Sequence, residues 1–475
     1  MGKYRYLIKN VGLLTLANFA TKLLQFFLVP LYTNILTTTE YGTYDLFNTT
    51  VGVLLPILTL NIQDAVIRFA LDKKYKREAV VTIGIRYLFI SNIIVAAGLG
   101  VNYIFGFSAL GKQYAIFFFL MFLTQSLSGI VTCYIRGTDK IADLSISSVI
   151  ASAVTIGLNI LFLVTFRWGL VGYFLANVIG PLVQSFYLTI RGQMFKKTHL
   201  TQRYETERKD MLAYSRPLIA NALAWWVNNA SDRYVVIFFC GLAANGVYSV
   251  ASKIPSILNV FQSIFNQAWE LSAVKDYDSE DKSGFFTNTY KAYNCLMTIV
   301  CSLIIVADKI LARILYAKDF YVAWRYVPWL TIAILFGALS GYVGGFFSAV
   351  KDSKVFATST VVGAVSNIIL NIIFTPIMGP LGAAIATTIC YVEVFAVRYI
   401  QSKKYIKLRI NFIRDIISYI ILVVQAIVLL AVQHRVALYG ILVVLFVFIV
   451  LLYIKDIKII FKKVLCHGVK SGAGK

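Results

Sequence analysis

The chain has 475 residues, of which 59% are hydrophobic and 14% are charged, and its formal net charge is +23. Soluble domains carry about 25% charged residues, so this composition excludes an ordinary soluble protein and indicates a polytopic membrane protein. The positive charge does not indicate nucleic-acid binding, because the basic residues lie in short loops between apolar runs, as membrane orientation requires.

Motifs for several other kinds of chemistry are absent. The six cysteines are scattered and form no CxxC or Cys/His pattern, which argues against a disulfide framework and a metal site. The sequence contains no Walker loop, so we expect neither ATP hydrolysis by this chain nor a cofactor. The first apolar run is too long for the core of a signal peptide and is expected to remain as a helix.

The first predicted span, residues 10–36, is long enough to cross a bilayer, which takes roughly 20 residues of helix. Asn18, Lys22 and Gln25 lie within it, at spacings that place them on one helical face. A lysine at mid-membrane depth is unfavourable against lipid, so we expect this face to meet protein or water. The turn-rich stretch LTTTEYGTYD follows, and the next apolar run begins at Thr43.

The chain as a whole is predicted to be all-α, with about fourteen membrane spans. They are residues 10–36, 43–63, 80–105, 114–135, 141–166, 169–190, 211–240, 245–269, 289–307, 322–350, 355–377, 382–400, 412–432 and 436–454. Alternate loops differ sharply in charge, because one set, with both termini, holds 34 Lys and Arg residues and the other holds 7. Basic residues stay on the cytoplasmic side, so both termini are predicted to be cytoplasmic.

Several motifs recur about two hundred residues apart. Ala17-Asn18 is echoed by Ala220-Asn221, and EYGTY by ANGVY. The run IGLNILF is echoed by IILNIIF, and each run is followed by a Gly-x-x-Gly. Repeats of this kind are common in secondary transporters, so we predict two six-helix lobes followed by two extra helices. The predicted divisions are 1–195 for the first lobe, 196–210 for a cytoplasmic linker, 211–404 for the second lobe, and 405–475 for helices 13 and 14 with a basic tail.

Polar and ionisable residues concentrate in spans 1, 2, 7 and 8, which are equivalent pairs under the repeat. Such residues at membrane depth mark functional sites, so we predict that these spans share a water-filled cavity. The predicted cations of this cavity are Lys22, Arg216, Arg233 and Lys253. The predicted polar lining is Asn18, Gln25, Asn221, Trp225, Asn228, Ser256, Asn259 and Asn266. The carboxylates available for ion coupling are Asp64, Asp232 and Glu270.

Simpler roles compete with these predictions. Asn and Ser stripes also hold helices together in lipid, and for the neutral residues packing is favoured over substrate contact. Asp64 and Arg68 have the spacing of an i,i+4 ion pair, which competes with a functional role. For Lys22, Arg233 and Lys253 a functional role is favoured, because a cation inside a membrane requires a compensating contact.

The whole chain resembles bacterial polysaccharide flippases of the Wzx type, in the multidrug/oligosaccharidyl-lipid/polysaccharide exporter superfamily. The resemblance is strongest at LYTNILTTTEYGTY, residues 31–44, and at residues 371–386 with their Gly-x-x-Gly-Ala-Ala-x-Ala. These motifs mark the superfamily well and the substrate poorly. The resemblance implies a cavity between the two lobes, lined chiefly by helices 1, 2, 7 and 8, and alternating access.

The resemblance also implies a substrate, which is an oligosaccharide joined through pyrophosphate to a polyprenyl lipid. It implies transfer from the cytoplasmic to the outer leaflet of a bacterial inner membrane, for synthesis of O-antigen, capsule or exopolysaccharide. The four predicted cations would then bind the pyrophosphate. A glycan polymerase and chain-length proteins are the expected protein partners, and the driving ion, sodium or proton, is left open.

Two other functions stay open. The first is a drug or metabolite antiporter of the same superfamily, which a cavity with a dominant carboxylate and few cations would favour. The second is a membrane enzyme that polymerises or ligates glycans, which would need a large outer catalytic loop. The predicted outer loops are short, so a transporter is expected rather than an enzyme.

Overall fold

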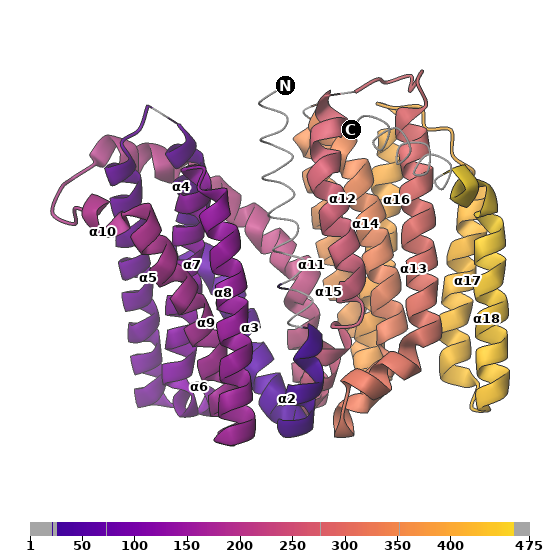
Figure 1. The fold of residues 1–475 in the computed structure, drawn as a ribbon, viewed down its shortest axis with the longest axis horizontal. Coiled ribbons are helices and arrows are strands. Elements are labelled where there is room, and N and C mark those ends of the chain that lie inside the picture. Colours follow the sequence, from indigo (N-terminus) through magenta and orange to yellow (C-terminus); the bar gives the residue numbers. More distant parts are fainter. Residues whose placement is uncertain (1–20, 22–25, 73, 276, 351, 460–475) are drawn as a thin grey trace, which may run out of the picture. The chain divides into compact units, whose positions relative to one another are not determined.

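The computed structural model describes residues 21, 26–72, 74–275, 277–350 and 352–459. The regular structure in these ranges is entirely helical (Figure 1), so the predicted all-α class is confirmed. The chain forms two compact units. Unit 1 comprises Met1–Tyr234, Gly241–Gly246 and Ala317–Asp319, and unit 2 comprises Val235–Cys240, Val247–Tyr316 and Phe320–Lys475.

The described helices have the length and composition of membrane spans. Eleven of them are long and apolar enough to cross a membrane, or 12 if one bent pair is counted as a span. Most of the predicted first span lies outside the described residues, so fourteen spans stays a prediction. The chain is therefore a multi-pass membrane protein.

Unit 1 is a helical bundle in which α5, α7, α8 and α9 lie side by side, with α6 and α10 at opposite ends (Figure 1). Its elements are α2 (Val29–Ile35), α3 (Thr38–Leu58), α4 (Ile62–Leu71), α5 (Arg77–Phe105), α6 (Ala109–Gln113), α7 (Ala115–Gly137), α8 (Ile141–Asn159), the π-helix η1 (Ile160–Thr165), α9 (Gly169–Gly192), α10 (Met194–Lys197) and part of α11 (Glu205–Ala251).

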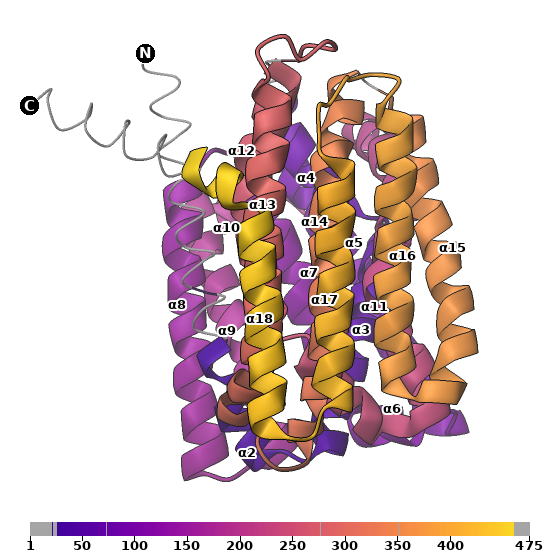
Figure 2. The ribbon, with the colours of Figure 1, turned by 90° about the vertical axis from the view of Figure 1, so that its right-hand side faces the viewer.

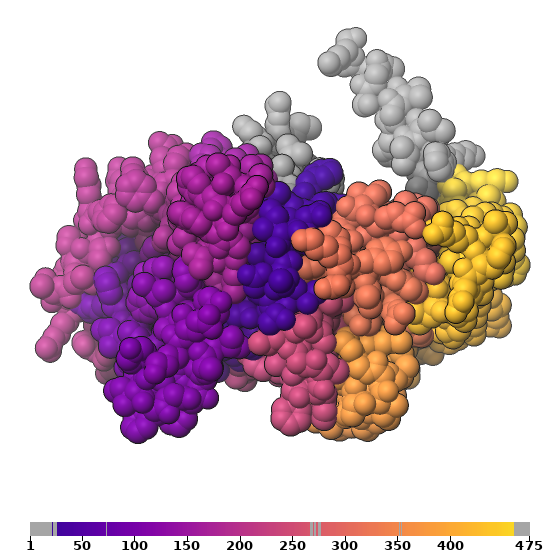
Figure 3. All heavy atoms as spheres, turned by 90° about the horizontal axis from the view of Figure 1, so that it is seen from below, coloured from indigo at the N-terminus to yellow at the C-terminus, as the bar shows by residue number. Residues whose placement is uncertain are grey.

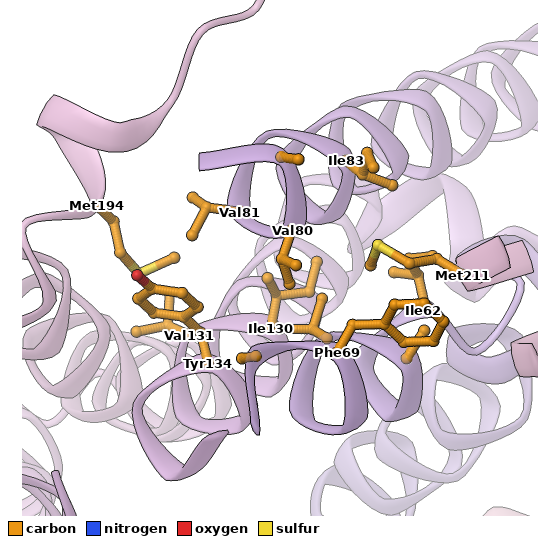
Figure 4. Close-up of a cluster of buried hydrophobic side chains, with 14 of the residues drawn as sticks. Ile62, Phe69, Val80, Val81, Ile83, Ile130, Val131, Tyr134, Met194 and Met211 are labelled. Atoms are coloured by element: carbon orange, nitrogen blue, oxygen red, sulfur yellow. The ribbon is translucent and has the colours of Figure 1, made fainter. Parts of the chain in front are cut away.

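A buried apolar cluster joins α4, α5 and α7 within unit 1 (Figure 4). Ile62, Val80 and Ile130 contribute to it from these three helices and are almost fully buried. Met194 of α10 and Met211 of α11 belong to the same cluster. The predicted linker, residues 196–210, is therefore anchored on unit 1 just before its first residue and just after its last.

The second predicted span begins at Thr38 rather than at Thr43. Thr37 is the N-cap of α3, where its hydroxyl accepts a hydrogen bond from the Glu40 amide at 3.2 Å. The Glu40 carboxylate in turn accepts from the Thr37 amide at 2.8 Å. This reciprocal capping box satisfies two amides that helix formation leaves unpaired, so most of the stretch predicted as a turn is helical.

The same predicted span is broken near its end. α3 and α4 meet at an angle of 59°, and Leu60 and Asn61 between them have φ values of 52° and 51°. Residues other than glycine rarely adopt this left-handed conformation. Broken helices of this kind occur in transporters near their substrate sites.

Unit 2 contains the second set of long helices, several of which run roughly parallel (Figure 2). They are α12 (Ser256–Lys275), α13 (Phe285–Leu315), the 3₁₀ helix η2 (Lys318–Arg325, whose first two residues belong to unit 1), α14 (Val327–Ala349), α15 (Ser353–Met378), α16 (Pro380–Ser402), α17 (Phe412–Ala431) and α18 (Arg435–Leu452). α13 extends further than predicted, and Asp308, expected in an outer loop, lies within this helix and is fully buried.

The two helices outside the repeat, α17 and α18, pack against α13 (Figure 3). Asn294 of α13 donates to the Tyr453 hydroxyl at 3.1 Å and accepts from the Tyr419 hydroxyl at 2.9 Å. About two turns further along α13, the Ser302 hydroxyl donates to the side-chain oxygen of Gln425 at 2.9 Å. Hydrogen bonds between membrane helices contribute about 0.6–2 kcal/mol each, so these helices are an integral part of unit 2.

The asparagine of the repeated motif makes the same side-chain hydrogen bond in each unit. The side-chain amides of Asn159 and Asn371 each donate to the carbonyl four residues earlier at 2.8 Å. The first glycine after each motif, Gly169 or Gly379, has a positive φ, of 54° and 63°. Glycine adopts this conformation without the strain of a Cβ atom, which explains its presence at both turns.

The second glycine of each Gly-x-x-Gly makes an equivalent contact. A Cβ atom on Gly172 would lie 2.9 Å from the Phe162 Cβ, and one on Gly382 would lie 2.2 Å from the Phe374 carbonyl oxygen. Phe162 and Phe374 both stand three residues after the repeated asparagine. Each motif therefore brings its second glycine against the equivalent phenylalanine, which lies in the π-helix η1 in unit 1 and in α15 in unit 2. Superposition of the complete lobes stays a prediction.

Candidate functional site

A buried ion pair connects α3 and α11 within unit 1. Arg233 Nε lies 3.2 Å from Asp45 Oδ2, and the side chains are 22% and 9% exposed. Thr49, one turn after Asp45 on the same face of α3, lies 3.5 Å from Arg233 Nη1 through its hydroxyl. The guanidinium thus reaches two groups of α3 that helical periodicity places together.

Further hydrogen bonds surround this ion pair. Asn245 donates to Asp45 Oδ2 at 3.2 Å and to the Gly42 carbonyl at 3.3 Å. The Trp226 indole donates to the Thr49 carbonyl at 3.0 Å. These contacts fix the rotamer of Asp45 and hold α11 against α3 over several turns.

Asp45 is the residue that the sequence prediction missed. Its charge balances the charge of Arg233, so the predicted cation already has a partner inside the protein. The sequence did contain an indication that Asp45 lies within a span, because it is the last residue of EYGTYD and an apolar segment follows it directly. A phosphate or pyrophosphate oxygen has the chemistry to replace the Asp45 carboxylate, because both accept charged hydrogen bonds from a guanidinium.

The other predicted cations have different environments. Arg216 is exposed on the unit 1 part of α11, and Lys253 is half-buried in the turn between α11 and α12, in unit 2. In the described ranges, no carboxylate lies within 4.0 Å of either charged group. Lys22 falls outside the described residues. A cavity shared by these cations stays a prediction.

The predicted polar lining divides into exposed and packed residues. Asn221 and Trp225 are exposed, Asn228 is buried and donates to the Ala224 carbonyl at 3.0 Å, and Ser256 donates to the Lys253 carbonyl at 2.6 Å. Asn259 is half-buried. Asn266 packs against α14, where a Cβ atom on Gly341 would lie 3.7 Å from its amide nitrogen. Asn18 and Gln25 lie outside the described residues.

Two of the three predicted coupling carboxylates have described partners. Asp64 Oδ2 accepts a hydrogen bond from the side-chain amide of Asn61 at 2.7 Å. Among the described residues, no salt bridge joins Asp64 to Arg68. The structure therefore does not contain the alternative i,i+4 ion pair, and a coupling role for Asp64 stays a prediction. Asp232 is buried and accepts from the Arg233 backbone amide at 2.9 Å. The Glu270 side chain is outside what the structure describes.

A small polar pocket of about 150 Å³ lies at the end of α4 in unit 1. It is lined by Arg68, Phe69, Asp72, Tyr75 and Tyr214. The Tyr75 hydroxyl donates to the Asp210 carboxylate at 2.9 Å, and this hydrogen bond raises the pKa of Tyr75. Aromatic rings beside an arginine provide apolar faces and charged donors, which suits a sugar or a phosphate.

The described residues contain no cluster of three or more His, Cys, Asp or Glu side chains that could hold a metal ion. Asp308 lies within α13, and neither of its carboxylate oxygens has a hydrogen-bond partner among the described residues. Asp415 in α17 pairs with Arg414 at 3.0 Å. These two buried carboxylates were absent from the sequence prediction.

Comparison with known proteins gives consistent results. Residues 7–269 match the model of the family described as polysaccharide biosynthesis protein. A curated relative is the probable low-salt glycan biosynthesis flippase Agl15 of Haloferax volcanii, which is 20% identical over 395 residues, 80% of this chain and 79% of the relative.

Two kinds of solved structure share the fold. The lipid II flippase MurJ in an inward closed conformation has a TM-score of 0.71 at 16% identity, covering 95% of this chain and 99% of that chain. An inward-facing multidrug resistance MATE family transporter of the MOP superfamily has a TM-score of 0.61 at 14% identity, covering 82% and 95%. At these identities the likeness concerns the fold.

Proposed function

Since this chain belongs to the polysaccharide biosynthesis protein family, we propose that it is a transporter that moves a lipid-linked glycan across the membrane. The similarity to a glycan biosynthesis flippase over four-fifths of the chain supports this proposal. The fold shared with a lipid II flippase over nearly the whole chain is consistent with it.

The proposed substrate is an oligosaccharide linked through pyrophosphate to a polyprenyl lipid. Its headgroup would pass from the cytoplasmic to the outer leaflet of a bacterial inner membrane by alternating access, with both termini of the protein in the cytoplasm. The product would serve the synthesis of O-antigen, capsule or exopolysaccharide. A glycan polymerase and chain-length proteins would act on it next.

The observation that carries the proposal is the presence of cations on helices of a membrane-spanning chain. A charged side chain inside a span is unfavourable by about 3 kcal/mol on insertion scales, so its retention calls for an anionic partner. Arg233 has such a partner in Asp45, at 3.2 Å. We infer that Asp45 holds the guanidinium in place until a pyrophosphate oxygen replaces the carboxylate.

The remaining proposed contacts follow from charge and position. Arg216 is exposed and Lys253 is half-buried, and each would donate charged hydrogen bonds to the pyrophosphate. The pocket beside Arg68 would receive a sugar at the end of α4. Coupling to a sodium or proton gradient would use a carboxylate such as Asp64, Asp232 or Glu270.

Export of drugs or metabolites is the second candidate function. The observation that favours it is the fold shared with MATE family transporters. The cations of this chain argue against it, because a binding site for cationic drugs needs an excess of carboxylates. The two candidates therefore differ in the predicted sign of charge at the binding site.

A deletion strain provides the test. Cells that lack this chain should accumulate one polyprenyl-pyrophosphate-linked oligosaccharide on the cytoplasmic side of the membrane, measured by extraction and mass spectrometry. Resistance to cationic drugs should be unchanged. Normal levels of every lipid-linked glycan, together with increased drug sensitivity, would support the antiporter instead.

A further inference from the structure

An apolar groove of about 670 Å³ lies in unit 1 between α5, α7 and α9, beside the short helix α10. Phe89, Phe186 and Phe195 line it and are each more than half exposed. Large exposed apolar surfaces mark contacts with a membrane or another molecule. On a multi-pass membrane protein, this groove is therefore open to the lipid bilayer.

The three hydroxyls of the groove wall, those of Ser185, Thr189 and Thr198, each donate to the backbone carbonyl four residues earlier. The Ser185 hydroxyl donates to the Pro181 carbonyl at 2.8 Å, and the Thr189 hydroxyl donates to the Ser185 carbonyl at 2.7 Å. Their donors do not require a polar ligand. The wall consequently suits a hydrocarbon chain, and its volume lies within the range of about 300–1,000 Å³ that small-ligand sites occupy.

The rim of the groove carries positive charge. Arg86 follows the lining residue Ile85 along α5, and its guanidinium donates to the carbonyl of Leu200, another lining residue, at 2.7 Å. Lys196 is exposed and follows the lining residue Phe195. Among the described residues, neither Arg86 nor Lys196 has a carboxylate within 4.0 Å.

An acidic residue at the same end of the unit is already neutralised. Asp143, at the start of α8, pairs with Arg191 at 2.9 Å. The positive-inside rule assigns this end, with its basic loops, to the cytoplasmic side. The rim therefore presents two cations, Arg86 and Lys196, without a paired carboxylate among the described residues, at the level where inner-leaflet lipid headgroups lie.

We propose that this groove binds an anionic phospholipid of the inner leaflet. One acyl chain occupies the apolar groove, and the phosphate lies against Arg86 and Lys196. Basic pockets between membrane helices on the cytoplasmic side bind anionic headgroups in this way. A neutral zwitterionic lipid would fill the groove without the same electrostatic attraction.

The bound lipid would also support the segment that leads from α10 to α11. The His199 amide donates to the Thr82 hydroxyl at 3.0 Å, and Arg86 holds the Leu200 carbonyl. Leu200 is half exposed and forms one wall of the groove. An acyl chain in the groove buries this side chain and so stabilises the segment against α5.

Native mass spectrometry of the purified full-length chain tests the proposal. Phosphatidylglycerol should bind at least about tenfold more tightly than phosphatidylcholine with the same acyl chains, because two cations each contribute about fivefold near a phosphate. Lys196→Gln should reduce this preference about fivefold, as one such contact would. Thr189→Phe should reduce binding of both lipids by filling the groove.

Two matched controls separate the groove from general effects. Lys209→Gln removes an equal charge from an exposed position that does not line the groove, and Ile190→Phe adds an aromatic ring at the adjacent exposed position of α9. Both should bind phosphatidylglycerol as the parent chain does. Equal effects of controls and test variants would overturn the proposal.

Two further results would also overturn it. One is equal affinity for the two phospholipids. The other is tighter binding of undecaprenyl phosphate than of phosphatidylglycerol to the parent chain, with the tighter binding lost in Thr189→Phe, because the groove would then hold the prenyl chain of a substrate. The assay measures no transport, so its failure would leave the proposed function standing.

Discussion

Gly42 of α3 and Gly246 of α11 make a reciprocal backbone contact within unit 1. A Cβ atom on Gly42 would lie 2.0 Å from the Leu242 carbonyl oxygen, and one on Gly246 would lie 1.9 Å from the Thr38 carbonyl oxygen. In both cases the carbonyl stands four residues before the opposite glycine. The repeated motif therefore meets its own copy in a locally two-fold arrangement, as self-complementary contacts do.

The close contact predicts that either glycine is intolerant of a side chain. Gly42→Ala and Gly246→Ala should each destabilise the protein by about 1–3 kcal/mol or more, because α3 and α11 must separate to admit a methyl group. Thermal unfolding of the detergent-purified protein measures this. Gly98→Ala in α5 is the control, because nothing lies within 4 Å of its Cβ position. Equal stability of all three variants would show that the helices do not approach at these glycines.

The ion pair of Asp45 and Arg233 predicts strong coupling between two substitutions. Arg233→Gln leaves a buried carboxylate without its cation, which should destabilise the protein by about 3–5 kcal/mol. Adding Asp45→Asn should recover most of this loss, as measured by thermal unfolding. Recovery of stability without recovery of glycan export would assign a substrate role to Arg233. If export also returns, the arginine serves structure alone.

Lys22 lies outside the described residues, and its predicted role rests on sequence. Lys22→Ala should abolish glycan export at near-normal protein level, because a pyrophosphate would lose a charged donor. Lys22→Arg should retain part of the export. Lys22→Gln keeps a hydrogen-bond donor without the charge, and export at the normal rate in this variant would end the pyrophosphate assignment. Complementation of the deletion strain measures all three.

The hydrogen bonds of Asn294 predict that this residue helps to hold α17 and α18 against α13. Asn294→Leu should destabilise the protein by about 1–3 kcal/mol, because the buried Tyr453 hydroxyl and the partly buried Tyr419 hydroxyl each lose a partner. Trypsin should then cleave the basic segment between α16 and α17, residues 403–411, faster than in the parent chain. Asn229→Leu, at an exposed position, is the control. Unchanged cleavage and stability would mean that apolar packing alone holds the two helices.

The charge distribution of the loops predicts the topology. Reporter fusions after His199 and after Lys475 should both report the cytoplasm, because basic loops stay on that side. A periplasmic signal at either position would overturn the assignment of both termini to the cytoplasm. The same experiment would revise the number of spans.

The sequence by itself determined the class of the fold and the place of most helices. The last two predicted spans, 412–432 and 436–454, correspond closely to α17 (Phe412–Ala431) and α18 (Arg435–Leu452). An apolar run of bilayer length has to satisfy its own backbone hydrogen bonds, so it must be a helix. The repeat could also be recognised in the sequence. Gly169 and Gly379 are needed for a local backbone conformation with positive φ, so the same glycine recurs in both motifs whatever lies elsewhere in the fold.

Only the tertiary structure decided which polar residues meet. The sequence marked Arg233 as a buried cation, but Asp45 became its partner because α11 crosses α3 at Gly42 and Gly246. Likewise, Asn294 joins Tyr453 from a helix 159 residues away in sequence. Helical periodicity sets the face on which a side chain lies. The partner of that face depends on interhelical packing, which no local pattern specifies.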